Sequence, residues 1–180
     1  MDTSILKPVI ICYTGGTAGD IISRIIDPGE LSLDRQRLKK PHLFSCDEEK
    51  DQYIDSSTWG SLPSHDFEYH QSRQHGILGI RCRDTPTALW AASRFKSQHR
   101  PHVWEEMSRA CGANTIEQYA QMIIDFGNMI ANYTNNVLYL DRIIAGHVVA
   151  DLLDLDMPVP GKDLYTEWLI NEKMHNTNPG

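Results

Sequence analysis

Apolar residues occur along this chain in two patterns, as short unbroken runs and as longer stretches with helical spacing. Three short runs are bounded by Pro, Gly or polar residues, as is typical of strands buried on both faces of a parallel sheet. They are PVIICY at 8–13, HGILGIRCR at 75–83 and NVLYL at 136–140. A shorter candidate strand is SLPS at 61–64.

Helical patterns separate these runs. In the segment 18–27, Ile21, Ile22, Ile25 and Ile26 form one helical stripe, and the DPGE sequence that follows ends the helix. The spacing predicts further helices over 85–98, 101–112, 114–134, 142–156 and 160–174. Strands that alternate with helices predict a three-layer α/β/α fold with a mainly parallel sheet. We expect a single domain over 1–180, with a polar excursion or flap around 31–58.

Composition and charge narrow the function classes. The chain has 180 residues and a net charge of -7, which argues against broad, sequence-independent binding to nucleic acid. Basic segments at 34–40 and 94–102 leave local contact with nucleic acid open. No stretch is apolar enough to span a membrane and the first residues lack a signal core, so we expect a cytoplasmic protein without a membrane partner. Cys12 and Cys82 lie in apolar runs and are expected to be buried thiols.

The CYTGGTAGD sequence at 12–20 joins the first strand to the first helix. Free N–H groups at a helix N-terminus, together with the helix dipole, favour a bound phosphate or sulfate, and small residues let an anion approach the backbone. The candidate anion site consists of Thr14, Gly15, Gly16, Thr17, Ala18, Gly19 and Asp20.

The same turn has an interpretation without a ligand. Thr17 and Asp20 match a capping box, with Thr17 as the N-cap. The P-loop pattern G-x-x-x-x-G-K-[ST] and the dinucleotide pattern G-x-G-x-x-G are both absent, and Asp20 stands where a Lys would assist. The turn alone leaves both interpretations open.

A second group of residues favours the anion site. His65 and Asp66, the candidate catalytic residues, follow the 61–64 strand, and Arg83 ends the 75–83 run. Because carboxyl ends of parallel strands meet at one edge, these residues and the glycine turn are expected to converge. A His can accept the proton of an acceptor hydroxyl, while Arg and backbone N–H groups stabilise charge on a transferred phosphoryl or sulfuryl group.

In these segments the chain resembles the sulfotransferase family of the P-loop fold. The resembling segments are VIICYTGGTAGDIISRII, LPSHDF, IRCRDTPTALWAASRF and NVLYLDRIIAGHVVADLLDLDMP. The resemblance implies a 3′-phosphoadenosine-5′-phosphosulfate donor held by the 14–20 turn, a hydroxyl-bearing acceptor and a catalytic His65. It also implies that Arg83 and Ser93 hold the 3′-phosphate of the donor.

Two other functions stay open, because the turn lacks the Lys or Arg that the family's loop usually carries and the chain is short for the family. One is a small P-loop kinase, for instance a viral one, that uses ATP with Mg²⁺ to phosphorylate a nucleotide or a modified base. Asp66 or Asp84 would then hold the metal. The other is a non-catalytic binding module whose nucleotide site has decayed, so that the domain only binds partners.

The remaining His and Trp residues are interpreted as structural. His147 is expected to pack within the 142–156 helix, and Trp90, Trp104 and Trp168 are expected to pack in the core. His70 and His75 are expected to flank a loop, and their spacing with His65 matches no familiar metal-ligand set, so no resident metal is predicted.

Overall fold

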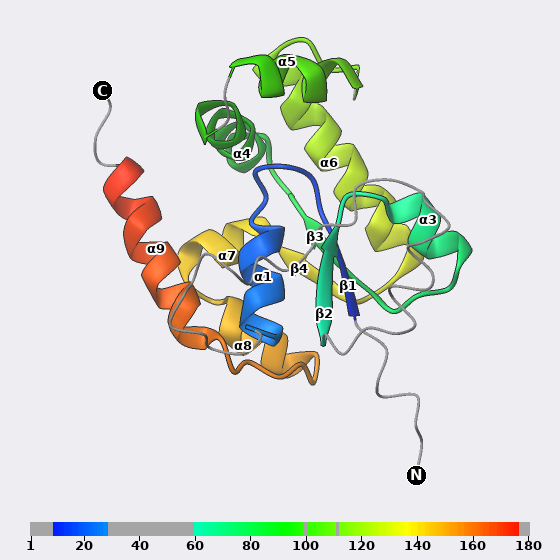
Figure 1. The fold of residues 1–180 in the computed structure, drawn as a ribbon, viewed down its shortest axis with the longest axis vertical. Helices are drawn as coiled ribbons and strands as arrows, with labels where there is room; N and C mark the ends of the chain where they lie inside the picture. Colours follow the sequence, from blue (N-terminus) through cyan, green and yellow to red (C-terminus); the bar gives the residue numbers. More distant parts are fainter. Residues whose placement is uncertain (1–8, 29–59, 99–100, 111, 177–180) are drawn as a thin grey trace.

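The computed structural model describes residues 9–28, 60–98, 101–110 and 112–176. Its sheet contains four parallel strands in the order β2-β1-β3-β4 (Figure 1). The strands are β1 at Val9–Cys12, β2 at Ser61–Ser64, β3 at Ile77–Arg81 and β4 at Val137–Tyr139. The α/β fold with a parallel sheet is therefore confirmed, while the expected excursion around 31–58 lies outside the described residues.

Helices cover both faces of this sheet and its carboxyl edge. They are α1 at Gly19–Ile26, α3 at Phe67–Ser72, α4 at Thr85–Gln98, α5 at Pro101–Ala110, α6 at Ile116–Tyr133, α7 at Leu140–Ala145, α8 at Val148–Asp154 and α9 at Lys162–Asn176. None of the helices in the described ranges combines the length and apolar character that a membrane crossing requires.

Side chains of the strands alternate between two apolar layers, as the pleat requires. Ile10 belongs to a cluster with Phe67 of α3 and Ile130 of α6 on one face. Ile11 and Leu78 belong to the cluster on the other face, which includes the isoleucines of α1 and apolar residues of α7 and α8. The continuous apolar runs in the sequence follow from this two-sided burial.

The strand order reverses next to β1. β1 pairs with β2 on one side and with β3 on the other, so that Ile11 lies opposite both Pro63 and Leu78. In parallel sheets a crevice opens at such a switch point, beyond the carboxyl ends of the strands. α4 and α5 lie beyond that end of the sheet in Figure 1.

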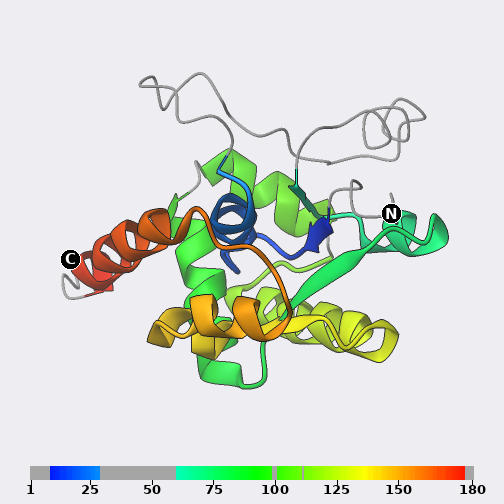
Figure 2. The same cartoon turned by 90° about the horizontal axis from the view of Figure 1, so that it is seen from below.

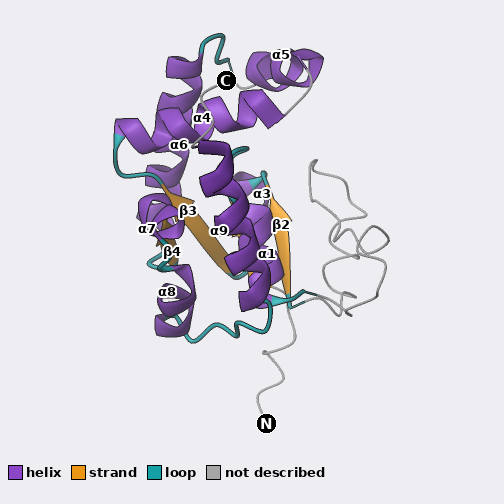
Figure 3. Ribbon diagram, turned by 90° about the vertical axis from the view of Figure 1, so that its left-hand side faces the viewer, coloured by secondary structure: helices purple, strands orange, loops and turns teal. Residues whose placement is uncertain are grey.

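α9 completes the layer that contains α1. The two helices pack against each other, and Figures 2 and 3 show them side by side. The Gly161 N–H donates to the Ile25 carbonyl at 2.9 Å, and the Tyr165 hydroxyl donates to the Ile143 carbonyl at 2.5 Å. The beginning of α9 is therefore attached to both α1 and α7.

Two segments differ from the sequence interpretation. The helix predicted over 142–156 is broken at Gly146, whose φ of 96° lies in the left-handed region. As a result His147 precedes α8 and is exposed rather than packed. The expected loop before His75 contains α3, in which His70 is fully buried.

Candidate functional site

The residues between β1 and α1 form a tight turn. The Thr14 carbonyl accepts both the N–H of Thr17 at 3.1 Å and its hydroxyl at 2.7 Å. Gly16, the third residue of this turn, has a φ of 94°, as a type II turn requires. The helix N-cap is Ala18, with no side-chain capping bond. The predicted capping box at Thr17 is therefore wrong, because the Thr17 side chain closes the turn instead.

The glycines of this turn are required by contacts within the protein. A Cβ on Gly15 would lie 2.5 Å from the ring of Phe95, and a Cβ on Gly16 would collide with the backbone of α4. A Cβ on Gly19 would collide with the ring of Tyr13. The glycine pattern is thus explained by packing, and evidence for a ligand must come from other residues.

Side chains from two helices hold the turn in place. The Gly15 carbonyl accepts a hydrogen bond from the Tyr119 hydroxyl of α6 at 3.1 Å. The Gly16 carbonyl accepts one from the Arg94 guanidinium of α4 at 3.2 Å. These bonds fix the turn relative to α4 and α6.

A cavity of about 460 Å³ lies at this turn, at the carboxyl end of β1. Parts of the chain that are distant in sequence line it. The lining residues are Tyr13, Gly15, Gly16, Ala18, Gly19, Asp20, Ile21, Arg24, His65, Arg94, Phe95, Gln98, Val103 and Trp168. Five members of the predicted anion site are among them, whereas Thr14 and Thr17 are not. The convergence of His65 with the glycine turn, expected from the parallel sheet, is present.

His65 lines the cavity in a defined tautomer. Its Nδ1 lies 2.8 Å from the backbone carbonyl oxygen of Tyr13. The centres of the His65 and Tyr13 rings are 4.3 Å apart. Because a carbonyl only accepts hydrogen bonds, Nδ1 carries the proton and Nε2 is the basic nitrogen. Asp66, predicted beside it in the catalytic group, instead caps α3, where its carboxylate accepts the Tyr69 N–H at 3.3 Å.

Asp20 enters the cavity from the first turn of α1 and pairs with Tyr13. The pKa of Tyr13 is raised, first by burial and then by the nearby Asp20 carboxylate, to which the Tyr13 hydroxyl donates a hydrogen bond. Tyr13 is therefore a neutral donor at physiological pH. The carboxylate also lies at the positive end of the α1 dipole, which favours its charged form.

Arg94 lines the cavity, although the sequence interpretation assigned it no role in the site. Ser93, predicted to hold the donor nucleotide, is exposed on α4, and the next residue lines the cavity instead. The guanidinium of Arg94 contacts both carboxylate oxygens of Glu172 in α9, with Nε–Oε2 at 3.0 Å and Nη2–Oε1 at 2.9 Å. The sequence signal was the basic segment at 94–102, but a solvated helix face has the same pattern.

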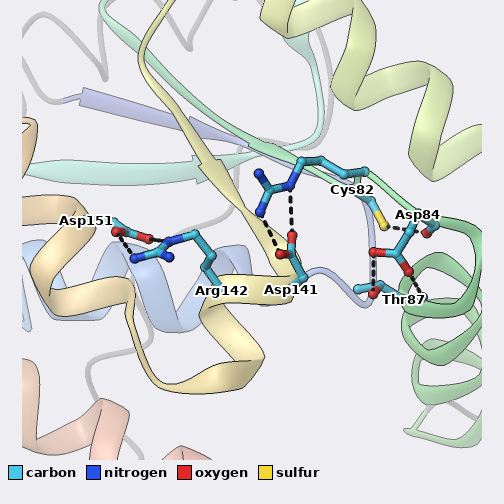
Figure 4. Close-up of polar contacts among 7 residues, drawn as sticks. Cys82, Asp84, Thr87, Asp141, Arg142 and Asp151 are labelled. Atoms are coloured by element: carbon cyan, nitrogen blue, oxygen red, sulfur yellow. Dashed lines mark hydrogen bonds and ion pairs between the residues drawn. The ribbon is translucent and has the colours of Figure 1, made fainter.

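Arg83 and Asp84, which follow β3, are bonded outside the cavity lining. Two nitrogens of Arg83 contact the carboxylate of Asp141 at 3.2 and 2.6 Å, the contacts that the dashed lines at Asp141 mark in Figure 4. The Arg83 guanidinium also lies 4.0 Å from the ring centre of Tyr139. The Asp84 carboxylate accepts the N–H and the hydroxyl of Thr87, both at 2.8 Å (Figure 4). The structure therefore does not bring the predicted Arg83 and Ser93 into the site that contains His65.

The cavity does not contain a metal-binding set of side chains among the described residues. Within those ranges no group of three or more His, Cys, Asp or Glu side chains is placed to hold a metal ion. Besides Tyr13, the ionisable side chains that line the cavity are Asp20, Arg24, His65 and Arg94. This set suits an anionic ligand with a proton acceptor beside it.

Comparisons with known proteins identified no similar protein. No protein-family model matches the sequence, no curated protein matches it, and no solved structure matches the fold. The functional argument therefore depends on the cavity itself.

Proposed function

We propose that this protein transfers a sulfuryl group from a phosphoadenosine-type donor to the hydroxyl of an acceptor. One observation carries the proposal: His65, the first turn of α1 and Arg94 line a single cavity at the switch point of a parallel sheet. Switch points are where open α/β sheets bind ligands, and an Arg beside a helix N-terminus suits a phosphate or sulfate group.

His65 acts as the general base in this proposal. Its Nε2 takes the proton of the acceptor hydroxyl as that oxygen forms a bond to the donor sulfur. The bond between sulfur and the bridging phosphate oxygen breaks, and adenosine 3′,5′-bisphosphate leaves with the electron pair. Arg94 and the N–H groups of the first turn of α1 offset negative charge on the donor. The bond between Nδ1 and the Tyr13 carbonyl maintains the basic tautomer.

Nucleotide binding is the first test. A ligand that binds only the folded protein adds about 2.7 kcal/mol to stability at about 100 times its Kd. We expect adenosine 3′,5′-bisphosphate to raise Tm in a thermal-shift panel more than ADP or ATP with Mg²⁺ does. A larger shift with ATP and Mg²⁺ would favour the kinase, and no shift with any nucleotide would contradict the proposal.

Substitution of His65 tests the chemistry separately from binding. His65→Gln is expected to retain adenosine 3′,5′-bisphosphate binding and to lower transfer by at least about 100-fold, the usual contribution of a general base. Transfer is measured as nucleotide release from the donor in the presence of phenols, sugars or nucleosides. His147→Gln is the matched control, because His147 is exposed in front of α8 and lines no part of the cavity. Unchanged transfer in His65→Gln would overturn the assigned role.

A non-catalytic binding module with a decayed nucleotide site is the second candidate. It is favoured by the packing of Gly15, Gly16 and Gly19 against the protein's own atoms, which leaves the glycine turn without need of a donor phosphate. This candidate predicts that no nucleotide raises the Tm of wild type or of His65→Gln, and that neither protein consumes the donor.

A further inference from the structure

The Arg94 guanidinium lies between two aromatic side chains and one carboxylate. Its central carbon is 5.8 Å from the ring centre of Trp90 and 5.5 Å from that of Trp168. Both carboxylate oxygens of Glu172 in α9 contact this guanidinium. The side chains of Arg94 and Glu172 are only 16% and 13% exposed. Arg94, one of the two Arg side chains that line the cavity, is thus already paired with an anion of the same chain.

This pairing sets the charge of the cavity. Asp20 and Arg24 contribute opposite charges to the lining, and Glu172 neutralises Arg94. With Glu172 in place the cavity carries no net charge apart from any proton on His65. The Arg94 guanidinium can hold an anionic ligand with both arms of its fork only when Glu172 leaves it.

We propose that Arg94 binds the phosphate or sulfate group of the ligand and that Glu172 is an internal competitor for it. The planar fork of an Arg holds a carboxylate and a phosphate in the same two-bond manner, so one can replace the other. The inference rests on the proposed function in requiring that the ligand of this cavity is anionic.

α9 is attached in a way that permits this exchange. Its beginning is fixed by the Gly161 N–H on the Ile25 carbonyl and by the buried Tyr165 hydroxyl on the Ile143 carbonyl. Further along the helix Trp168 stacks on Tyr165 and packs on the apolar core, while Glu172 contacts Arg94. Displacement of Glu172 therefore releases the end of α9 while its beginning stays in place.

Affinity for adenosine 3′,5′-bisphosphate, measured by titration calorimetry on the full chain, tests the exchange. Glu172→Gln is expected to bind about tenfold more tightly than wild type, and Arg94→Gln about tenfold more weakly, as for truncated charge pairs of partial burial. In the double variant the gain from Glu172→Gln should vanish, because its benefit acts through Arg94. Arg94→Lys, which keeps the charge but loses the fork, should also bind more weakly and serves if Arg94→Gln does not fold.

Asp163→Asn provides the matched control. It removes the same charge from the same helix at an exposed position in its first turn, and it should leave affinity unchanged. An equal gain in Asp163→Asn and Glu172→Gln would overturn the competition, since a general charge effect would then explain both. Unchanged affinity in Glu172→Gln would also overturn it, and unchanged affinity in both Arg94 variants would overturn the role of Arg94. The first two results would leave the proposed function standing, whereas the third would also remove the part of Arg94 in it. Nucleotide binding by none of the proteins would remove both proposals.

Hydrogen exchange gives a second readout of the same step. Saturating adenosine 3′,5′-bisphosphate should speed amide exchange in the part of α9 that follows Trp168 and leave the part around Tyr165 unchanged. Slower exchange after Trp168 would mean that the ligand tightens α9, and would overturn the displacement of Glu172.

Discussion

Gly16 is the residue at which turn geometry and packing coincide. Its φ of 94° is accessible to glycine at little cost, and the place of its missing Cβ is filled by the backbone of α4. Its carbonyl holds the Arg94 guanidinium at 3.2 Å. Arg94, one of the charged residues of the cavity, is therefore positioned by a turn that also lines the cavity.

Gly16→Ala should destabilise the protein for two reasons. The left-handed φ costs about 1–2 kcal/mol for alanine, and the collision with α4 adds to this, so we expect a loss of about 2–4 kcal/mol in the free energy of unfolding. Gly146→Ala is the matched control, since Gly146 has a φ of 96° but the nearest atom to its Cβ would be 3.7 Å away. It should cost only about 1–2 kcal/mol in urea denaturation. Equal losses would show that packing on α4 contributes nothing.

Asp141 gives the protein a pH-dependent contribution to stability. The hydrogen bond from Arg83, and then its charge, hold the pKa of Asp141 below its ordinary value of 3.8. A carboxyl with a lowered folded-state pKa stabilises above its unfolded pKa, and this stability is lost as the pH falls through the folded pKa. The Tm difference between wild type and Asp141→Asn should therefore be present near neutral pH and disappear in strong acid. In an Arg83→Gln background the same substitution should show little pH dependence; an undiminished dependence would assign it to another partner.

At the scale of elements, α9 has two attachments with different chemistry. Tyr165 is a buried neutral anchor, whereas Glu172 forms a charged contact with a cavity residue. Neutral anchors contribute to folding at any ligand concentration, while a charged contact can be exchanged for another anion. This division places the stability of the helix near its beginning and its response to ligand near its end.

Tyr165→Phe should weaken this anchor without changing the shape of the core. Loss of the hydroxyl leaves the buried Ile143 carbonyl without this donor, which costs about 1–2 kcal/mol in the free energy of unfolding. Tyr133→Phe removes a hydroxyl from a side chain that is 42% exposed and should change stability by less than about 0.5 kcal/mol. Urea denaturation of both variants makes the comparison. If Tyr165→Phe and Tyr133→Phe both lower the free energy of unfolding by a similarly small amount, the Tyr165 hydroxyl does not anchor α9.

The sequence predicted long, periodic elements well because two-sided burial and helical stripes are visible in a single chain. It joined α7 and α8 because Ile143, Ile144, Val148 and Val149 continue one apolar spacing, and only the left-handed backbone of Gly146 separates them. It missed α3, which has six residues and depends on the Asp66 cap rather than on periodicity. Short elements of this kind are decided by local hydrogen bonds and tertiary contacts.

At the scale of the molecule, the site was predictable as far as topology determines it. Parallel strands bring the residues after β1 and β2 to one edge, so the glycine turn and His65 could be placed together from the sequence. The choice between Ser93 and Arg94 could not be made, because one step along a helix turns a side chain by about 100°. Glu172 is 78 positions from Arg94, and no local pattern connects them.

The rate at which a thiol reagent modifies Cys12 should measure how often the whole sheet unfolds. Cys12 is fully buried in β1, the central partner of β2 and β3, and burial followed by the Asp66 charge raises the pKa of its thiol. Both effects suppress the reactive thiolate, so modification by a thiol reagent should require unfolding. For a domain with about 5 kcal/mol or more of stability, labelling should be slower than in the denatured chain by a factor of about 1,000 or more.

Peptide mass spectrometry can follow Cys12 separately from the other cysteines. Its labelling rate should rise steeply with urea below the unfolding transition, with the same dependence as global unfolding, because the open state is the unfolded state. Fully denatured protein provides the reference rate. A rate that is independent of urea would instead show that β1 opens locally, and the sheet could then not be the rigid support on which the turn, His65 and Arg94 are held together.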